Sequence, residues 1–508
     1  MVDINYLKSL KAPQKIPTGI IGFEHISKGG LPENRTTLIA GTSGSGKTLL
    51  SLELIQRFIT ENDYACVFVT MEEPLKDIVE NVQSFGWDLI DFVEKKKLNF
   101  IDISETPLSS HEIGEYNLSG LLKQIEHAIK QINARVLIVD AIGALFSQFK
   151  NKDIVRQEIL KITNLIKKMN VTVILTAERL EDYGHISRYG FEEFIADNVI
   201  ILRNVLQEEN VRRTIQILKM RGGDHFQGEY PFSLTHNGFH IMALSEMELK
   251  QSSSNVRCSF GNKKIDEMTN GGLFRDSILL ISGPTGSGKT SMCSTFIQET
   301  CNNKEKILVF AYEESREQLM RNADSLEIQF KKWETEGLLK LICLYPETLG
   351  LEEHLLLIKK EINEFKPRRL IIDSVSAMER ISSTRNFREF IISLTSFVKK
   401  NEVCSMLTCT TPDLAGGGSV TEAHISTITD IIILLRYVEI AGTMRRGIAV
   451  IKMRGSQHAK QIHEFQIDKT GLHIATPFKN VQNIILGIPT SSGIDEVDRL
   501  DQMFEQKI

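Results

Sequence analysis

The chain has 508 residues, of which 42% are hydrophobic and 25% charged, and its formal net charge is −5. This length predicts two or three domains, and the ordinary composition predicts a globular protein. The slightly acidic balance argues against a nucleic-acid binder and against a polybasic membrane surface. No apolar stretch approaches a membrane span, and the seven cysteines form no C-x-x-C pair, so we expect a cytoplasmic protein with reduced thiols.

The first segment that carries chemistry is Gly41–Thr48, with the sequence GTSGSGKT. It follows an apolar run, Thr37–Ala40, and precedes a helical pattern, which is the context that a phosphate-binding loop requires. Its glycines let backbone N–H groups surround phosphates, Lys47 reaches the β- and γ-phosphates, and Thr48 places its hydroxyl on Mg²⁺. The predicted nucleotide contacts here are Gly41, Thr42, Ser43, Gly44, Ser45, Gly46, Lys47, Thr48 and Leu49.

Acidic residues stand at the ends of the two apolar runs that follow. Glu72 and Glu73 end the run that begins at Cys66, and a carboxylate there can orient and deprotonate the group that attacks the γ-phosphate. The alternative is that these acids cap the next helix, especially Glu73 before Pro74. Asp140 ends a later run and suits the metal side of the site, although a strand-end aspartate can also cap a helix.

Lys219 and Arg221 lie in an extended pattern far downstream, just before a glycine. Alternation along a strand places both cations on one side and Met220 on the other. Two cations on one face suit a phosphate-facing finger, and in a ring they would reach the nucleotide of a neighbouring subunit. The alternative is a solvated strand edge.

The whole arrangement then recurs, which indicates a tandem duplication of one domain. A second phosphate-binding loop lies at Gly283–Thr290, and the intervals that follow match those of the first copy. Asp140 lies 79 residues before Lys219, and Asp373 lies 79 residues before Lys452. The predicted nucleotide contacts of the second loop are Thr285, Gly286, Ser287, Gly288, Lys289, Thr290 and Ser291, and its acid pair is Glu313 and Glu314.

Strands alternate with amphipathic segments of helix length, one of which spans 121–132, so we predict an α/β fold with mostly parallel sheets covered on both faces. We place the first domain at 1–247, the second at 248–480 and a C-terminal tail at 481–508. The polar stretch 250–255 is the expected linker, and the apolar spacing over 494–508 predicts a short amphipathic docking or regulatory helix.

Hydroxyl side chains distinguish the second copy from the first. Ser426 and Thr427 stand before Asp430, whereas no Ser or Thr aligns with them before Asp197. Hydroxyls near an ATP site can accept phosphate, although Ser and Thr are also ordinary turn formers.

These residues together resemble the KaiC family of circadian clock proteins, which are RecA/DnaB-like double ATPases. The resemblance covers nearly the whole chain and includes the strings ERLEDYG at 178–184, FAYEESR at 310–316 and HISTITD at 424–430. It implies two tandem RecA-like domains in a homohexameric double ring, with ATP and Mg²⁺ at the subunit interfaces.

The resemblance also implies roles for individual residues. The first domain would be the slow ATPase, with Glu72 and Glu73 activating water and with further nucleotide contacts from Ser84, Lys219, Met220, Arg221, Gly223, His225, Thr235 and His236. The second would be an autokinase and autophosphatase, in which Ser426 and Thr427 accept phosphate, Thr421 accepts it transiently, and Glu313 or Glu314 is the base. The contacts of that ring to a neighbouring nucleotide would be Arg446, Lys452, Met453, Arg454, Gly455, Ser456, His458 and Lys460. The metal ligands would be Thr48, Asp140, Thr290, Glu313 and Asp373.

Partner proteins follow from the same resemblance. A KaiB-like protein is an expected partner, whereas the divergent tail argues against dependence on a KaiA-like protein. Two other hypotheses remain: a DNA-dependent ATPase motor, and a ring scaffold that binds ATP only for assembly. The acidic balance and the absence of a basic, aromatic-rich loop oppose the motor, and the acid pairs oppose the scaffold.

Overall fold

The computed structural model describes residues 12–104, 115–146, 168–188, 192–207, 210–242, 253–411, 425–440, 442–478, 481–482 and 490–491. The chain divides into two compact units, Met1–Glu246 and Met247–Ile508, which are described separately. Thr421, the first half of the predicted linker and the predicted tail helix at 494–508 lie outside the described residues.

The first unit is built on a nine-stranded sheet of described residues. Six neighbouring strands are parallel, and the last three run antiparallel. From the parallel edge the order is β5 (Leu98–Asp102), β4 (Cys66–Thr70), β6 (Val136–Asp140), β7 (Thr172–Glu178), β3 (Thr36–Gly41), β8 (Asn198–Gln207), β9 (Asn210–Met220), β10 (Glu229–Thr235) and β11 (Gly238–Ile241). A separate two-stranded sheet pairs β1 (Lys15–Ile16) with β2 (Leu31–Pro32).

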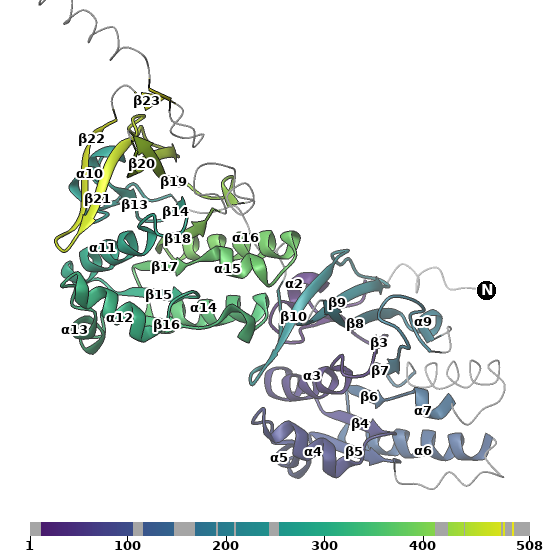
Figure 1. The fold of residues 1–508 in the computed structure, drawn as a ribbon. Coiled ribbons are helices and arrows are strands. Elements are labelled where there is room, and N and C mark those ends of the chain that lie inside the picture. The colour runs from purple at the N-terminus through teal and green to yellow at the C-terminus, as the bar shows by residue number, and fades with distance from the viewer. Residues whose placement is uncertain are drawn as a thin grey trace, which may run out of the picture. The chain divides into compact units, whose positions relative to one another are not determined.

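Helices cover both faces of this sheet because its strands are apolar on both sides. In β4, Phe68 packs into the core beneath α3, α4 and α5, and the adjacent Val69 packs beneath α6. Figure 1 shows these two layers, with α7 beside α6. The described helices are α2 (Phe23–Ser27), α3 (Lys47–Asn62), α4 (Leu75–Gln83), α5 (Leu89–Glu94), α6 (Glu115–Ile132), α7 (Gly143–Phe146) and α9 (Glu192–Ile195).

The second unit repeats this topology strand for strand. Its sheet has the order β16 (Leu339–Cys343), β15 (Ile307–Ala311), β17 (Arg369–Asp373), β18 (Cys404–Thr410), β14 (Ile278–Gly283), β19 (Ile431–Ile440), β20 (Thr443–Met453), β21 (His463–Asp468) and β22 (Gly471–Pro477). The hairpin of β12 (Arg257–Cys258) and β13 (Leu273–Phe274) corresponds to β1 and β2, and β23 (Val481–Gln482) pairs with β24 (Thr490–Ser491).

Helices also flank the second sheet on both sides (Figure 1). They are α10 (Lys263–Met268), α11 (Lys289–Asn302), α12 (Arg316–Ser325), α13 (Phe330–Thr335), α14 (Leu351–Phe365), α15 (Val375–Arg380) and α16 (Thr384–Lys400), with a 3₁₀ turn, η2, at Pro346–Thr348. Two tandem α/β domains with mostly parallel sheets therefore confirm the predicted fold class, and α6 confirms the covering helix predicted over 121–132.

Functional residues gather at the two ends of the central strand of each sheet. We call these the loop edge, where the parallel strands end, and the far edge, where they begin. β3 and β14 each lead directly into a phosphate-binding loop, and the parallel neighbours of these strands end at the same edge. Each central strand has six residues, so the opposite edge lies about 17 Å away along the strand. This length decides which side chains can meet one nucleotide.

Candidate active sites

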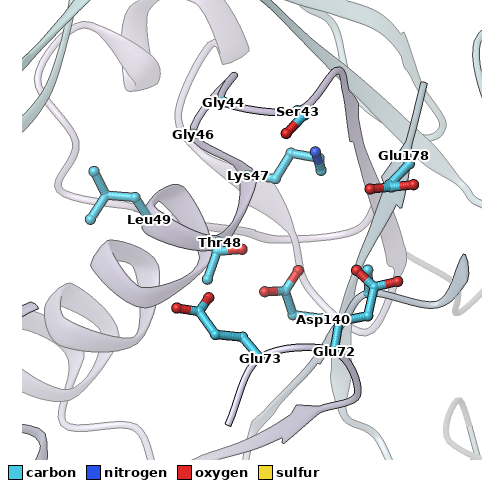
Figure 2. Close-up of a pocket in the computed structure, with 11 residues that line it drawn as sticks. Ser43, Gly44, Gly46, Lys47, Thr48, Leu49, Glu72, Glu73, Asp140 and Glu178 are labelled. Atoms are coloured by element: carbon cyan, nitrogen blue, oxygen red, sulfur yellow. The ribbon is translucent and has the colours of Figure 1, made fainter. Parts of the chain in front are cut away.

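A pocket of about 350 Å³ lies at the phosphate-loop edge of the first domain. Figure 2 shows Lys47, Glu72, Asp140 and Glu178 projecting into it from different elements. It is lined by Ser43, Gly44, Gly46, Lys47, Thr48, Leu49, Glu72, Glu73, Asp140, Ala141 and Glu178. The loop and both acid segments predicted from the sequence therefore meet at one place.

The loop glycines hold a backbone that other residues rarely adopt. Gly46 has φ of 93°, and a Cβ there would lie 3.1 Å from the Phe239 ring. Lys47 folds back over the loop, and its Nζ donates to the carbonyl oxygens of Gly41 (3.0 Å) and Thr42 (2.9 Å). Burial lowers the pKa of Lys47, and the nearby carboxylates Glu178, Asp140 and Glu72 partly offset this effect.

The two acids after β4 have different surroundings. Glu73 accepts a hydrogen bond of 2.8 Å from Asn81 Nδ2, which fixes its carboxylate at the start of α4. Burial raises the pKa of Glu72, and the negative charges of Glu178 and Asp140 raise it further. Thr176 on β7 donates to the buried Asp140. Glu72 thus faces the pocket interior among other acids, while Glu73 is anchored at its border.

Glu178 was not among the predicted site residues. It ends β7, and the sheet register pairs it with Gly41, the first residue of the loop. In the second domain the same register position, opposite Gly283, holds Thr410. The first site therefore has one carboxylate more than the second.

The second domain repeats the loop geometry. Lys289 Nζ donates to the carbonyl oxygens of Gly283 (2.8 Å) and Pro284 (3.0 Å), and burial lowers its pKa. Asp373 accepts a hydrogen bond from Thr408, and burial raises the pKa of Asp373 to about 6. Pro284 has no N–H to donate, and its carbonyl oxygen serves the lysine as that of Thr42 does.

Hydrogen bonds separate the roles of the second acid pair. Glu314 accepts from Thr290 Oγ1 (3.2 Å) with one oxygen and from Asn322 Nδ2 (2.9 Å) with the other. Glu313 accepts instead from Ser374 Oγ (2.9 Å) and lies 3.6 Å from Arg380. Glu314 is therefore tied to the hydroxyl of Thr290 in the loop, whereas Glu313 is held from the β17 side of the site.

The Lys-Met-Arg segments lie at the opposite edge from the loop of their own domain. β8 and β9 place Met220 opposite Asn198, which pairs with Thr37 near the start of β3. In the second domain, Met453 pairs with Ile431, which is level with Leu279. The methionines are buried, so the lysine and arginine share the other side, as the alternation predicts.

The turn that carries the predicted phosphoacceptors, Ser426 and Thr427, packs on the Lys-Met-Arg segment of the second domain. Lys452 Nζ donates to the carbonyl oxygens of Ser426 and Thr429, both at 2.6 Å, and Arg454 Nη2 donates 2.5 Å to that of Thr427. Asp430 joins the turn to the start of β14 through two bonds with the backbone of Ile278. Ser426 and Thr427 thus lie about 17 Å along the sheet from Gly283.

In the first domain, the corresponding lysine and arginine contact the segment that ends at Asp197, but that segment carries no Ser or Thr at the positions of Ser426 and Thr427. Lys219 Nζ donates to the carbonyl oxygen of Glu193 (2.9 Å), and Arg221 lies 3.8 Å from Asp197. Asp197 bonds to Thr36, which begins the central strand.

Other predicted contacts divide between the two edges. Arg446 was grouped with the contacts to a neighbouring nucleotide, but its Nη2 lies 3.5 Å from the carbonyl oxygen of Gly286, in the loop of its own domain. Thr235 ends β10 and His236 follows it, at the loop edge. The loops after β9 and β20 carry Gly223, His225, Gly455, Ser456, His458 and Lys460 at the far edge, and the exposed Ser84 ends α4.

Two features are absent from the described residues. Among them, no group of three or more His, Cys, Asp or Glu side chains is arranged to hold a metal ion. None of the described helices is long and apolar enough to span a membrane.

Comparisons with known proteins agree with this geometry. The family model for the KaiC ATPase matches the chain twice, at residues 16–246 and 258–478. The chain is 50% identical over 497 residues to circadian clock protein KaiC3 of Synechocystis sp., covering 97% of this chain and 98% of that protein. It is 48% identical over 503 residues to circadian clock oscillator protein KaiC of Synechococcus elongatus, covering 99% and 97%. The chain therefore belongs to the KaiC family of ATPases, as the sequence motifs predicted, and it binds ATP.

Proposed function

We propose that this protein is an ATP-driven timer in which the first domain hydrolyses ATP and the second phosphorylates and dephosphorylates its own Ser426 and Thr427. The proposal rests on one observation: the acceptor turn is held by Lys452 and Arg454 at the sheet edge opposite the phosphate-binding loop of its own domain. The names of the relatives, circadian clock proteins, support the timer role. The family match favours this function over a DNA motor.

The separation of the two edges supports a ring assembly. A hydroxyl about 17 Å along the sheet from the loop cannot reach a γ-phosphate bound there. Transfer therefore requires the loop of a second subunit, and a closed ring gives every subunit such a neighbour. We propose a homohexamer, in which Lys452 and Arg454 present the acceptor turn to the adjoining nucleotide.

Mg²⁺ fits the groups at the loop edge. Thr290 and Glu314 bring hard oxygen donors together at 3.2 Å, and Asp373 ends the neighbouring strand. Mg²⁺ prefers such donors and keeps several waters and phosphate oxygens in its shell. When bound, it would neutralise charge on the β- and γ-phosphates.

The chain's own residues supply the remaining chemistry. Lys289 would exchange the carbonyl oxygens of Gly283 and Pro284 for phosphate oxygens. Glu313 would take the proton of the attacking hydroxyl, whose oxygen bonds to the γ-phosphorus as the bond to ADP breaks. In the first domain Glu72 would take a proton from water, so that phosphate leaves in solution.

Incubation with Mg·ATP, with and without single-stranded DNA, tests this function. Phosphate should be mapped by mass spectrometry, and ADP release should be measured in parallel. We expect phosphate at Ser426 and Thr427 and a hydrolysis rate that DNA does not change. Unlabelled acceptors together with DNA-stimulated hydrolysis would refute the autokinase and support a DNA-dependent motor.

A further inference from the structure

A small pocket of about 70 Å³ in the second domain lies away from the nucleotide site. Two thiols, Cys258 on β12 and Cys404 at the start of β18, contribute to its wall. It is lined by Val256, Arg257, Cys258, Arg275, Glu305, Arg368, Arg369 and Cys404. Its volume admits a molecule of two or three heavy atoms.

The two thiols line the same small pocket, and Ser277 Oγ lies 4.0 Å from Cys404 Sγ. The Cys258 thiol donates a 3.5 Å hydrogen bond to the carbonyl oxygen of Leu273, across the hairpin. Cys258 is partly exposed and Cys404 is buried, so solvent reaches one thiol of the pair first.

A buried arginine faces this pair. Arg369 is 2% exposed, pairs with Cys404 in the sheet register and donates 2.9 Å to the carbonyl oxygen of Ser259. Its Nε has no hydrogen-bond partner among the described residues, and its only nearby carboxylate, Glu305, lies 3.7 Å from Nη2. A buried guanidinium with one unpaired N–H group favours an anion beside it, such as a thiolate.

Electrostatics favour the thiolate at Cys258. A hydrogen bond with Cys404 lowers the pKa of Cys258, burial opposes this, and the charge of Arg369 lowers it further. The same interaction and burial raise the pKa of Cys404. Cys258 is therefore the more readily deprotonated thiol of the two.

The first domain shows that the fold does not need these residues. The register of β1 with β2 puts Ile16 where Cys258 stands, and the register of β6 with β7 puts Val136 and Thr172 where Arg369 and Cys404 stand. All three residues of the first domain are buried. The same architecture therefore folds without a thiol pair or a buried arginine at these three positions.

We propose that Cys258 and Cys404 form a peroxide-sensitive dithiol. The Cys258 thiolate attacks the O–O bond of a hydroperoxide, gains one oxygen as sulfenic acid and releases water or an alcohol. The Cys404 sulfur then bonds to the Cys258 sulfur, the S–O bond breaks, and the Cys404 proton leaves with the hydroxyl as water. The two thiols lose two electrons and the peroxide gains two.

The disulfide would join the β12–β13 hairpin to the central sheet. Arg257, next to Cys258, donates 2.7 Å to Ser456, in the loop just after the Lys-Met-Arg segment. Oxidation would therefore restrain the loop that follows Arg454. Oxidation of these thiols does not depend on the proposed kinase function.

The test uses the full-length protein and hydrogen peroxide. After treatment at pH 7.5 and quenching with N-ethylmaleimide, peptide mapping should find Cys258 linked to Cys404, and dithiothreitol should remove the link. Cys343 is an internal control, because it is also partly exposed but burial raises its pKa. Cys258 should react at least several-fold faster than Cys343. Equal rates, or no linked peptide, would overturn the proposal.

Variants separate the two steps. Cys404→Thr copies the first domain and should leave Cys258 as a sulfenic acid that dimedone labels. Cys258→Ile, the matching exchange, should leave Cys404 unlabelled. Arg275→Gln removes a partly exposed arginine of the pocket and should slow oxidation several-fold. Dimedone on Cys404 in the Cys258→Ile variant would contradict the assigned order.

Discussion

Lys452 Nζ donates a 2.6 Å hydrogen bond to the carbonyl oxygen of Ser426, so a cation of β20 fixes the turn that carries the proposed acceptors. The lysine bonds to backbone carbonyl oxygens, so it orients the turn without using the side-chain hydroxyls. The position of Lys452, level with the start of β14, also places that turn far from the loop of the same domain.

Transfer between subunits can be tested by mixing two inactive variants. Glu313→Gln keeps the acceptors and lacks the base, while the double variant Ser426→Ala, Thr427→Ala keeps the base and lacks the acceptors. Because acceptor and loop lie at opposite edges, we expect phosphate on Glu313→Gln subunits in mixed rings, measured by mass spectrometry. Each variant alone should stay unlabelled, and a mixture without label would count against transfer between subunits.

The two acids of the second pair should differ in their kinetic effect. Glu313→Gln should lower phosphoryl transfer by about 10²–10⁴-fold, because a positioned base contributes about that much. ATP binding and first-domain hydrolysis should be unaffected. Glu314→Gln should mainly weaken the response to Mg²⁺, since Glu314 is bonded to Thr290. The measurement is the rate of labelling against Mg²⁺ concentration. If Glu314→Gln lowered the saturating rate and Glu313→Gln changed only the Mg²⁺ dependence, Glu314 would be the base and Glu313 the magnesium ligand.

Asn322 should act on magnesium through Glu314. Its Nδ2 donates 2.9 Å to the oxygen of Glu314 that does not face Thr290, so Asn322→Ala frees that carboxylate to rotate. The Mg²⁺ concentration for half-maximal labelling should rise several-fold, with a nearly normal rate at saturation. Asn401→Ala is a matched control, because Asn401 bonds only to its own helix at Phe397. A lower saturating rate with unchanged Mg²⁺ dependence would argue against this positioning role.

His354 should make the second domain sensitive to acid. The side chain is fully buried between Tyr312 and Pro346, and burial lowers its pKa below the ordinary value of 6.5. The unfolded chain then binds a proton that the folded chain does not, so stability is full above pH 6.5 and falls as the pH drops below it. The loss is at most about 1.4 kcal/mol per pH unit.

Calorimetry of wild type and His354→Gln at pH 7.5 and 5.5 measures this contribution. The variant should lose less of its unfolding temperature on acidification than the wild type, even if it is less stable at both values. An equal drop in both proteins would show that other groups account for the acid sensitivity.

Local patterns were sufficient to predict the fold class, because each strand, loop and covering helix has a recognisable residue pattern within a short stretch of sequence. The strand before Gly41, the amphipathic helix α6 and the repeated intervals all belong to short stretches of sequence. The family followed from the same motifs and is confirmed by the comparisons.

The remaining site features depend on which strands become neighbours. Glu178 meets the loop only because β7 pairs with β3, more than 130 residues apart. Arg446 was assigned to a neighbouring nucleotide, yet β20 brings it to Gly286 of its own domain. Asn81 and Asn322 each stand eight residues after the acid they hold, and nothing in a helical asparagine signals that bond.

The extra carboxylate of the first pocket has a consequence for how that domain loads. Glu72, Glu73, Asp140 and Glu178 surround a single ammonium group, Lys47, so the charge of the pocket opposes a polyphosphate. We therefore expect nucleotide to enter this pocket together with a divalent cation. Chelation of that cation should release nucleotide from the first domain before the second, where Thr410 stands in the position of Glu178.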